Sequence, residues 1–299
     1  MDSFKPISLS ALAEIQPFLQ HITFPDAALS CTNLFSWGVA MNYEYTIHAG
    51  YLLIRYTVDG KLFYLMPVGK GGIAPVIHFL LDDSVKTGHP FHMTGVNSEM
   101  QQRMEELMPG RFEFDYSRNY FDYIYLREDL ATLKGKKFHQ KRNHVNQFLK
   151  NYPDFEYIPL VPELVDECLN LEAEWFSIRL PNSPDVEDMN FERNMIKYAL
   201  SHIDDLEILG GTLYVDGKLV AFTFGSPINN DTFDVSVEKA NKAYEGSYAM
   251  INNQFVSHIP KQYTYINREE DMGIDGLRQA KLSYNPYKLL EKMDVYLKS

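Results

Sequence analysis

Three polar side chains stand two residues apart in the otherwise apolar segment DTFDVSVEKA: Asp234, Ser236 and Glu238. If this segment is a strand, the three share one face, because successive side chains of a strand point to opposite sides of the sheet. A carboxylate near the end of such a strand can accept a proton from an attacking amine or hydroxyl. The alternative for Glu238 is an ion pair with Lys239 or Arg268.

A second acidic group follows the predicted strand QYTYINRE. Glu269 and Asp271 stand beside Arg268, just before Gly273. At a strand end above a cleft, the two acids would act in catalysis by binding the acceptor amine, and Arg268 would face a carboxylate or phosphate. The alternative is a solvated acidic loop that binds nothing.

A basic segment, KGKKFHQKRNHVNQFLK, occupies residues 134–150 and carries six Lys and Arg residues but no acid, in a chain whose net charge is −12. On a helix, its apolar residues share one stripe: Phe138, Val145 and Leu149. Arg142 falls on that stripe and Lys141 on its edge, so we expect Arg142 to face the contact between two domains. There it would pair with an acid or clamp an anionic donor in the cleft between them.

Two further basic features are candidates for anion binding. Lys134, Lys136 and Lys137 form a solvated patch that would attract the phosphates of a tRNA or nucleotide, but these charges are too few for a dedicated nucleic-acid binder. GKGG at 69–72 is the other candidate, because three glycines and Lys70 at a strand-to-helix turn can cradle a phosphate. An ordinary glycine turn is the alternative there.

Composition and charge narrow the function classes. A pI near 5.2 disfavours indiscriminate binding to nucleic acid or anionic membrane, so any anion must be recognised locally. The sequence has no apolar run long enough to span a bilayer and no signal-peptide pattern, so we expect a cytoplasmic protein. The two cysteines, Cys31 and Cys168, form no disulfide framework, and the histidines lack metal-ligand spacing, so we assign no metal.

The elements that must position these residues are a mixture of helices and strands. Two hairpins are expected, turned at Asp59-Gly60 and at Asp216-Gly217, because Asp-Gly is a strong two-residue turn signal. Each half of the chain shows helices, such a hairpin, a further turn, a helix and more strand. The chain is expected to end as a helix over GLRQAKLSYNPYKLLEKM, broken near Pro286.

This shared order of elements predicts an α+β protein with two related domains, each a mixed sheet flanked by helices. We place the first domain at 1–133 and the second at 153–299. The basic segment would form the connecting helix between them, at 134–152.

Three segments resemble the uncharacterised bacterial proteins related to the C-terminal domain of lysylphosphatidylglycerol synthase: FHQKRNHVNQF, VSVEKANKAYEGSYAMIN and INREEDMGIDGLRQAKLSYNP. The resemblance covers most of the chain and is densest from about residue 120 to the end. It implies two tandem GNAT-like (acyl-CoA N-acyltransferase) domains, as in the Fem-type aminoacyltransferases. It also implies transfer of an acyl or aminoacyl group to an amine or hydroxyl. Unlike the membrane synthases, this chain has no transmembrane run, so phospholipid is not the expected acceptor.

In the GNAT fold that the resemblance implies, donor phosphates bind where a loop enters a helix, at a Gln/Arg-x-x-Gly-x-Gly/Ala pattern. The aligned stretch is AYEGSY, in which only the central Gly246 matches. Gly246, Ser247 and Tyr248 would line the donor loop, but the bulk of Tyr248 and the charge of Glu245 disfavour the pyrophosphate of coenzyme A. The alternative is a tight turn in which Gly246 or Ser247 caps the helix.

The resemblance also places the reacting amine at the end of the DTFDVSVEKA strand, which makes Glu238 the expected general base. Lys141 and Arg142 would hold the phosphate or carboxylate of the donor. We therefore predict an acyl- or aminoacyltransferase that takes aminoacyl-tRNA or another activated acyl donor, a coenzyme A thioester included, and a small-molecule acceptor. The alternative is a non-catalytic small-molecule or RNA-binding protein that kept the GNAT-like fold. The sequence leaves the donor, the acceptor and the oligomeric state open.

Overall fold

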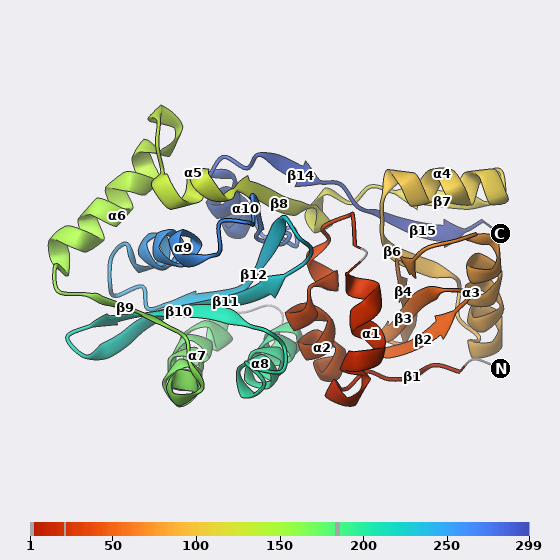
Figure 1. Ribbon diagram of the computed structural model, residues 1–299, viewed down its shortest axis with the longest axis horizontal. Helices are drawn as coiled ribbons and strands as arrows, with labels where there is room; N and C mark the ends of the chain where they lie inside the picture. Colours follow the sequence, from red (N-terminus) through yellow and green to blue (C-terminus); the bar gives the residue numbers. More distant parts are fainter. Residues whose placement is uncertain (1–2, 21, 183–185, 299) are drawn as a thin grey trace.

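The computed structural model describes residues 3–20, 22–182 and 186–298, which form two mixed sheets with helices around them (Figure 1). The strands of the first sheet are β1 (Lys5–Pro6), β2 (Glu44–His48), β3 (Tyr51–Val58), β4 (Lys61–Leu65), β5 (Val68–Gly69), β6 (His92–Val96), β7 (Phe112–Asp115) and β15 (Met293–Leu297). Those of the second are β8 (Asp122–Leu126), β9 (Glu156–Pro159), β10 (Leu209–Val215), β11 (Lys218–Pro227), β12 (Thr232–Ala240), β13 (Tyr265–Asn267) and β14 (Lys288–Leu290). The predicted α+β class with two mixed sheets is confirmed.

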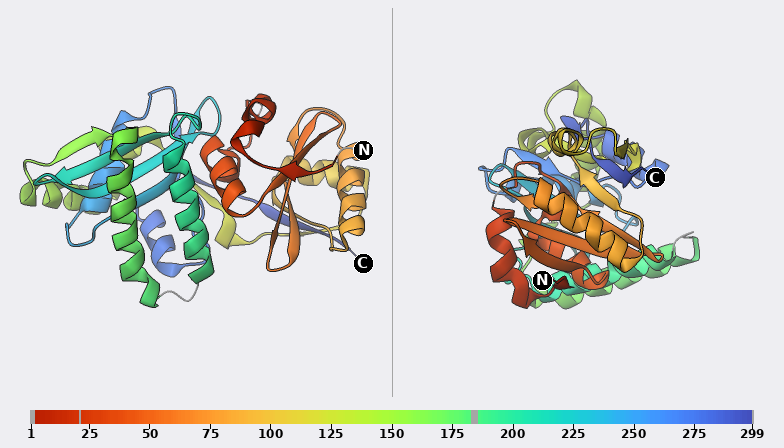
Figure 2. Two further views of the ribbon diagram at one scale, coloured as in Figure 1. Left: turned by 90° about the horizontal axis from the view of Figure 1, so that it is seen from below. Right: turned by 90° about the vertical axis from the view of Figure 1, so that its right-hand side faces the viewer.

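The α-helices of the described residues are α1 (Leu12–Leu19), α2 (Cys31–Ala40), α3 (Ala74–Thr87), α4 (Ser98–Leu107), α5 (Arg127–Thr132), α6 (His139–Asn151), α7 (Val165–Arg179), α8 (Val186–Ser201), α9 (Ser247–His258) and α10 (Asp275–Leu282). Helices α7 and α8 cover one face of the second sheet, whereas α5, α6 and α9 lie over the other face (Figures 1 and 2). Within the described part of the chain, no helix combines the length and the apolar character needed to cross a bilayer.

The two sheets exchange strands across the middle of the sequence. The order is β1-β2-β3-β4-β6-β15-β7 in the first sheet, with β5 on β3, and β14-β8-β13-β12-β11-β10-β9 in the second. Strand β8 thus joins the second sheet although it lies within 1–133, and β15 joins the first sheet although it lies within 153–299. The domain boundaries drawn from the sequence stay a prediction, and sheet membership crosses them in both directions.

The helix expected at the end of the chain is wrong beyond Leu282. Helix α10 ends there, and the remainder forms β14 and β15. Pro286 stops the helix, and each later strand finds an open partner: β14 pairs with β8, and β15 fills the space between β6 and β7. Met293 and Val295 are buried there (1% and 0% exposed), so strand pairing with distant segments outweighs the local helical pattern.

Both expected Asp-Gly hairpins are confirmed, at the β3–β4 and β10–β11 turns. Asp59 and Gly60 have φ values of 50° and 70°, and Asp216 and Gly217 have φ values of 51° and 71°. Positive φ at both central residues is the type I′ geometry, whose twist matches that of the flanking strands.

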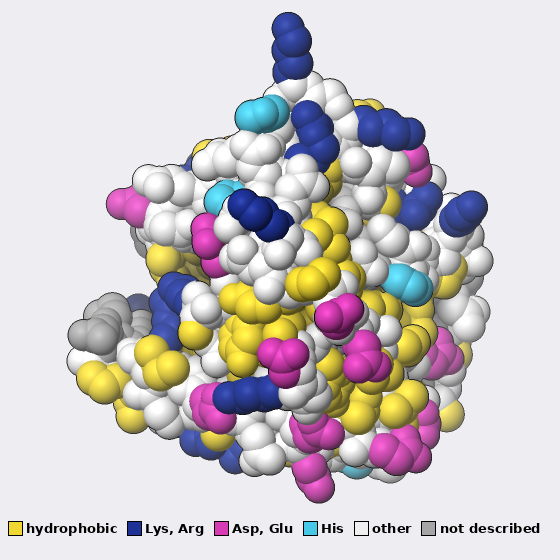
Figure 3. Space-filling view, turned by 90° about the vertical axis from the view of Figure 1, so that its left-hand side faces the viewer, with side chains coloured by type: hydrophobic (Ala, Val, Ile, Leu, Met, Phe, Trp, Pro, Cys, Tyr) yellow, Lys and Arg dark blue, Asp and Glu magenta, His cyan; other side chains and the backbone are white. Residues whose placement is uncertain are grey.

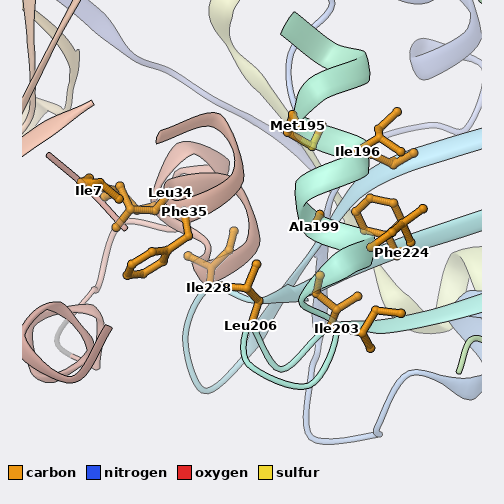
Figure 4. Packing of buried hydrophobic residues seen from close by; sticks show 14 of the residues in the cluster. Ile7, Leu34, Phe35, Met195, Ile196, Ala199, Ile203, Leu206, Phe224 and Ile228 are labelled. Carbon is orange, nitrogen blue, oxygen red and sulfur yellow. The ribbon is translucent and has the colours of Figure 1, made fainter. Parts of the chain in front are cut away.

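One hydrophobic core joins the two halves (Figure 4). Leu34 and Phe35 of α2 are fully buried on the same cluster as Ile196 of α8 and Phe224 of β11. Burial of each such side chain contributes about 1.5–3 kcal/mol. Helix α2 therefore holds the first half against the second sheet, and its N-terminus reaches the middle of β12.

Helix α6 lies at the end of the molecule away from the first sheet, where it packs on α9 (Figure 1). The expectation that Arg142 faces a contact between the two halves is therefore wrong. Arg142 Nη1 donates to the carbonyl oxygens of Leu133 and Gly135 and closes the turn before α6. Phe148 is the buried residue of the helix, whereas Leu149 is 40% exposed.

Candidate functional site

Two neighbouring parallel strands of the second sheet separate at their carboxyl ends. Strands β12 and β13 pair only at Thr232–Asp234 with Tyr265–Asn267. Beyond that point β12 continues to Ala240, while β13 ends at Asn267. We call residues 235–240 and 268–271 the strand fork. Ligands of open α/β sheets bind outside the carboxyl ends of parallel strands, so the fork is the first place to search for a site.

A β-bulge in β12 decides which side chains share a face of the fork. On β11 the residues Phe224 and Ser226 are two apart, but their partners Val237 and Asp234 on β12 are three apart. The extra residue of β12 lies opposite Gly225 of β11, where an added Cβ would clash with the carbonyl oxygen of Asp234. An inserted residue reverses the alternation of side chains.

The prediction that Asp234, Ser236 and Glu238 share one face is wrong for this reason. Val235 packs in the cluster with α9, whereas Val237 packs in the cluster on the opposite face, with α7 and α8. Glu238 accordingly meets α9, and Asp234 meets the N-terminus of α2.

Glu238 lies in a cationic and aromatic surrounding on the α9 face. Arg268 Nη2 lies 3.2 Å from both of its carboxylate oxygens, and Asn252 Nδ2 donates to Oε2 at 3.0 Å. The ring of Tyr284 holds two cations, with Arg268 Cζ at 4.7 Å and Lys141 Nζ at 4.1 Å from its centroid. We call these five residues the Glu238 site. Glu238 lies on β12, Arg268 follows β13, and Asn252 lies on α9. Tyr284 follows α10, and Lys141 lies on α6.

Two polar atoms of the Glu238 site are buried without a partner: Nη1 of Arg268 and Oδ1 of Asn252. Burial opposes the charge of Arg268, but the Glu238 carboxylate and two tyrosines raise its pKa, so it stays a cation. Burial lowers the pKa of Lys141 to about 8, and repulsion from Arg268 is the second, smaller cause. A buried cation with an unused donor fits an anionic ligand.

A second polar group lies on the α2 face of the fork. Asp234 Oδ2 accepts hydrogen bonds from Ser30 Oγ (3.1 Å), Asn33 Nδ2 (3.1 Å) and Ser236 Oγ (2.6 Å). Asn33 Nδ2 also donates to Glu269 Oε1 at 2.7 Å. We call these five residues the Asp234 site. Burial raises the pKa of Asp234 to about 8, and burial and the Asp234 charge raise that of Glu269.

Asp271 belongs to neither site. Arg118 Nη1 and Tyr123 Oη donate to its Oδ2, and Arg278 Nη2 and the backbone N–H of Gly273 donate to Oδ1. Burial would raise the pKa of Asp271, but these donors hold it well below its usual range. A carboxylate with all its acceptor positions occupied anchors the turn after β13, so the geometry gives no support to its predicted catalytic role.

The predicted donor loop lies at the N-terminus of α9, and α6 covers it. Gly246 has φ 87°, and a Cβ there would clash with the carbonyl oxygen of His144 and lie 3.0 Å from Cβ of Phe148. Ser247 Oγ donates to the carbonyl of Asn241, and Trp175 Nε1 donates to Tyr248 Oη at 3.1 Å. These contacts fill the surface at which a phosphate would approach.

The GKGG turn lies in the first sheet, apart from the fork. Gly71 O accepts hydrogen bonds from Tyr51 Oη (2.8 Å) and Arg103 Nη2 (2.7 Å), so a carbonyl of the turn is already held by a cation. Lys70 is exposed. Its predicted phosphate contact stays a prediction, and nothing brings it towards Glu238.

The structure thus brings Glu238, Arg268 and Lys141 together, and the ion pair between Glu238 and Arg268 that was the alternative for Glu238 is present. It adds Asn33 and Asn252, which sequence reasoning missed. Asn252 is 1% exposed although it stands in the polar run Asn252-Asn253-Gln254 of α9, so the sequence gives no signal of its burial. Asn33 gives no signal either, because it meets Asp234 only through the packing of α2.

Comparisons with known proteins show the family and the fold of this chain. Residues 22–296 match the family model described as phosphatidylglycerol lysyltransferase, C-terminal. The chain belongs to this family. Among the described residues, no group of three or more His, Cys, Asp or Glu side chains is arranged to hold a metal ion.

Solved structures of similar fold agree with that assignment. A conserved protein of unknown function from Bacteroides thetaiotaomicron is 47% identical, with a TM-score of 0.95 and 100% of both chains covered. The C-terminal domain of a putative lysylphosphatidylglycerol synthetase from Agrobacterium fabrum is 12% identical, with a TM-score of 0.71, and 98% of this chain and 93% of that one are covered. FemX is 10% identical, with a TM-score of 0.63, and 99% and 97% of the chains are covered.

A curated relative, an uncharacterized protein of Mycoplasmoides gallisepticum, is 26% identical over 173 residues, which are 57% of this chain and 54% of that protein. The chain therefore spans about half the length of this curated relative. The family match places this chain in an acyl- or aminoacyltransferase-type superfamily, and the neighbouring structures show that it shares the fold of FemX and of the putative synthetase domain from Agrobacterium fabrum.

Proposed function

We propose that this chain transfers an aminoacyl group from an activated donor to the amine or hydroxyl of a small-molecule acceptor at the strand fork. The observation that carries this proposal is the Glu238 site. It combines a carboxylate, a buried cation with an unused donor and a second cation of lowered pKa at the ends of two separating strands. Acyl transfer needs these groups: a proton acceptor and positive charge beside the developing oxyanion.

In the proposed reaction the acceptor nitrogen or oxygen attacks the carbonyl carbon of the donor ester directly. Glu238 takes the proton that the attacking group loses, and Arg268 and Lys141 stabilise the negative charge on the carbonyl oxygen. Collapse of the tetrahedral intermediate breaks the ester bond, and the proton goes to the departing hydroxyl. No covalent enzyme intermediate is required, because positioning and electrostatics supply the acceleration.

Two observations favour aminoacyl-tRNA over acetyl-CoA as the donor. Helix α6 packs on the Gly246 turn and covers the place at which a GNAT-like fold would bind the pyrophosphate of coenzyme A. Exposed lysines, Lys134 and Lys136, stand before α6, and Lys150 lies near its end. In Figure 3, which looks onto this end of the molecule, basic side chains gather on the upper part of the face and acidic ones on the lower part.

The test is transfer of label from bulk tRNA charged with radioactive amino acids, in the presence of a deproteinised small-molecule fraction of cell extract. We expect the wild-type chain to move label into small products. Glu238→Gln should abolish that turnover but leave binding of charged tRNA within about twofold, because glutamine keeps the shape and the bond from Asn252. A saturable rise in Tm with acetyl-CoA, together with acetyl transfer, would overturn the proposed donor.

The second candidate is a binding protein without turnover. It is favoured by the paired state of Glu238, whose two oxygens already receive Arg268 and Asn252. Under this alternative Glu238→Gln and wild type give the same null result in the transfer assay, and both bind the same ligand. Turnover by the wild type alone excludes it.

A further inference from the structure

The Asp234 site has no role in the reaction as proposed, yet it lies on the other face of the same fork. Asp234 and Asn33 are 0% and 3% exposed, and Glu269 is partly exposed and forms the rim. Glu269 has φ 57°, a left-handed conformation that costs a non-glycine residue about 1 kcal/mol or more. The backbone is therefore held so that this carboxyl group turns towards Asp234 and Asn33.

Two oxygens of the site are buried without a hydrogen-bond donor: Oδ1 of Asp234 and Oδ1 of Asn33. Asn33 lies between the two acids, because its Nδ2 donates to Asp234 at 3.1 Å and to Glu269 at 2.7 Å. Oδ1 and Nδ2 are bonded to the same carbon, so the free oxygen also borders the acids. Buried acceptors without donors are rare in folded proteins and indicate that a donor binds there.

Within the described residues, the lysines near these acids are hydrogen-bonded to other groups. Lys292 pairs with Asp26 (3.0 Å) and Asp122 (2.7 Å), and Lys281 Nζ donates to the backbone carbonyls of Arg268 and Glu270. Asp234 and Glu269 receive hydrogen bonds from neutral groups, and no lysine or arginine of the described residues forms an ion pair with either. Two acidic side chains and two unpaired oxygens thus lie at one place. A hydrogen-bond donor that carries a positive charge fits such a place.

We propose that Asp234, Glu269 and Asn33 bind the ammonium group of the aminoacyl residue that is transferred, an inference that rests on the proposed function. An ammonium carries three N–H donors and one positive charge, which match the free oxygens of Asp234 and Asn33 and the carboxylate of Glu269. The carbonyl carbon would then lie in the fork between this ammonium and the Glu238 site. The ammonium is either the α-amine or a side-chain amine, and the chemistry of recognition is the same for both.

This arrangement also selects the donor. An acetyl group leaves the buried oxygens of Asp234 and Asn33 without a donor, and a site built to bind a polar group rejects an analogue that lacks it. Burial raises the pKa of Asp234 to about 8, so arrival of an ammonium expels a proton from the site. The other charged groups that face Asp234 and Glu269 are Asp122, Glu270 and Lys281, and none of them directly contacts the free oxygens.

The test uses non-hydrolysable mimics of a charged tRNA end, 3′-aminoacylamino-3′-deoxyadenosines, titrated into the full chain by calorimetry. Four probes are compared: alanyl, N-acetylalanyl, lysyl and Nα-acetyllysyl. We expect the free-amine probes to bind wild type at least about tenfold more tightly than the fully acetylated one, because hydrogen bonds to charged groups contribute that much. If the Nα-acetyllysyl probe binds tightly, the site recognises a side-chain amine. If this probe binds weakly, the site recognises the α-amine.

Asp234→Asn and Glu269→Gln should each remove this preference while the affinity for N-acetylalanyl stays unchanged. The matched control is Asp231→Asn, which neutralises an exposed acid three residues from Asp234 and should keep the preference. Thermal melts verify that each variant is folded. If Asp234→Asn does not fold, the test rests on Glu269→Gln, which changes a residue at the rim.

The outcomes separate the inference from the proposed function. Equal binding of acetylated and free probes by wild type overturns the ammonium site and leaves the aminoacyl donor standing. A preference that survives both substitutions moves the ammonium elsewhere and overturns the assignment. If no probe binds while acetyl-CoA raises Tm, the proposed donor fails, and the ammonium site fails with it.

Discussion

The two faces of the strand fork share two strands but treat buried charge in opposite ways. On one face, Arg268 Nη2 lies 3.2 Å from Glu238 Oε1, and this carboxylate raises the pKa of Arg268, so the arginine stays a cation. On the other, Asp234 and Glu269 receive only neutral donors, and burial raises the pKa of both. A buried carboxylate keeps its charge when a cation is paired with it and holds a proton when none is. The Glu238 face is therefore a site with a paired cation, whereas the Asp234 face has no paired cation and changes charge when a ligand arrives.

The largest expected effect comes from breaking the fixed ion pair. Arg268→Leu leaves Glu238, whose side chain is 13% exposed, without its ion-pair partner, and removal of one partner of a buried pair costs about 3–5 kcal/mol. We expect a loss of about 3 kcal/mol in the free energy of unfolding, measured by urea denaturation. Asp234→Asn is the matched change on the other face and should cost far less, about 1 kcal/mol or below. Equal losses for the two variants would contradict the comparison.

A backbone change can disturb one face and leave the other. Gly246→Ala forces a Cβ against the carbonyl of His144 at φ 87°, which should cost about 2–3 kcal/mol and displace α6 with Lys141. Gly217→Ala, at φ 71° with no atom within 4 Å, carries the conformational cost alone, about 1 kcal/mol.

Transfer activity should fall in Gly246→Ala and persist in Gly217→Ala, because only the first substitution moves a residue of the Glu238 site. The preference for free-amine probes should persist in both variants. Loss of that preference in Gly246→Ala would show that the two faces are not independent.

The pH dependence sharpens the comparison on the Asp234 face. An unfolded aspartate has a pKa of about 3.9, and that of folded Asp234 is about 8. Between these values the folded protein holds a proton that the unfolded chain lacks, so this contribution is complete below pH 4 and is lost as pH rises through 8. Asp234→Asn has no such loss. Its stability relative to wild type should rise with pH, by at most about 1.4 kcal/mol per pH unit.

The measurement is Tm of both proteins from pH 5 to pH 9 at constant ionic strength. A constant difference across this range would mean that Asp234 is ionised throughout and that the two faces do not differ. Glu269 is present in both proteins, so its own titration largely cancels.

The smallest effect is expected outside the fork. Lys136→Ala removes an exposed charge and should change stability by less than about 0.5 kcal/mol. It should weaken charged tRNA binding and reduce the slope of log affinity against log salt by about 1, as for loss of one phosphate contact. Lys61→Ala, an exposed lysine of the first sheet, is the control and should change neither quantity. Affinity insensitive to salt would remove tRNA from the proposal.

Local signals predicted much of the fold and part of the site. The Asp-Gly turns, the helix in the basic segment and the strand within DTFDVSVEKA follow from turn chemistry and apolar periodicity, which act between near neighbours. Glu238 was assigned as the base through a family resemblance, whereas Lys141 was named from its position on the basic helix and Arg268 as an anion-facing residue or an ion-pair partner of Glu238. The terminal helix failed because nothing local reveals that β8, β6 and β7 offer open edges to 288–297.

The sequence by itself determined the residue types of the fork, its position after a strand and the excess of acid over base in the chain. Only the tertiary structure decided which acid is paired with a cation. The bulge of β12 opposite Gly225 turned Asp234 and Glu238 to opposite faces, and α2 brought Asn33 to Asp234 from 201 residues away. The pKa of a carboxyl group depends on burial and on the charge of its neighbours in space, and these are fixed only when distant segments pack together.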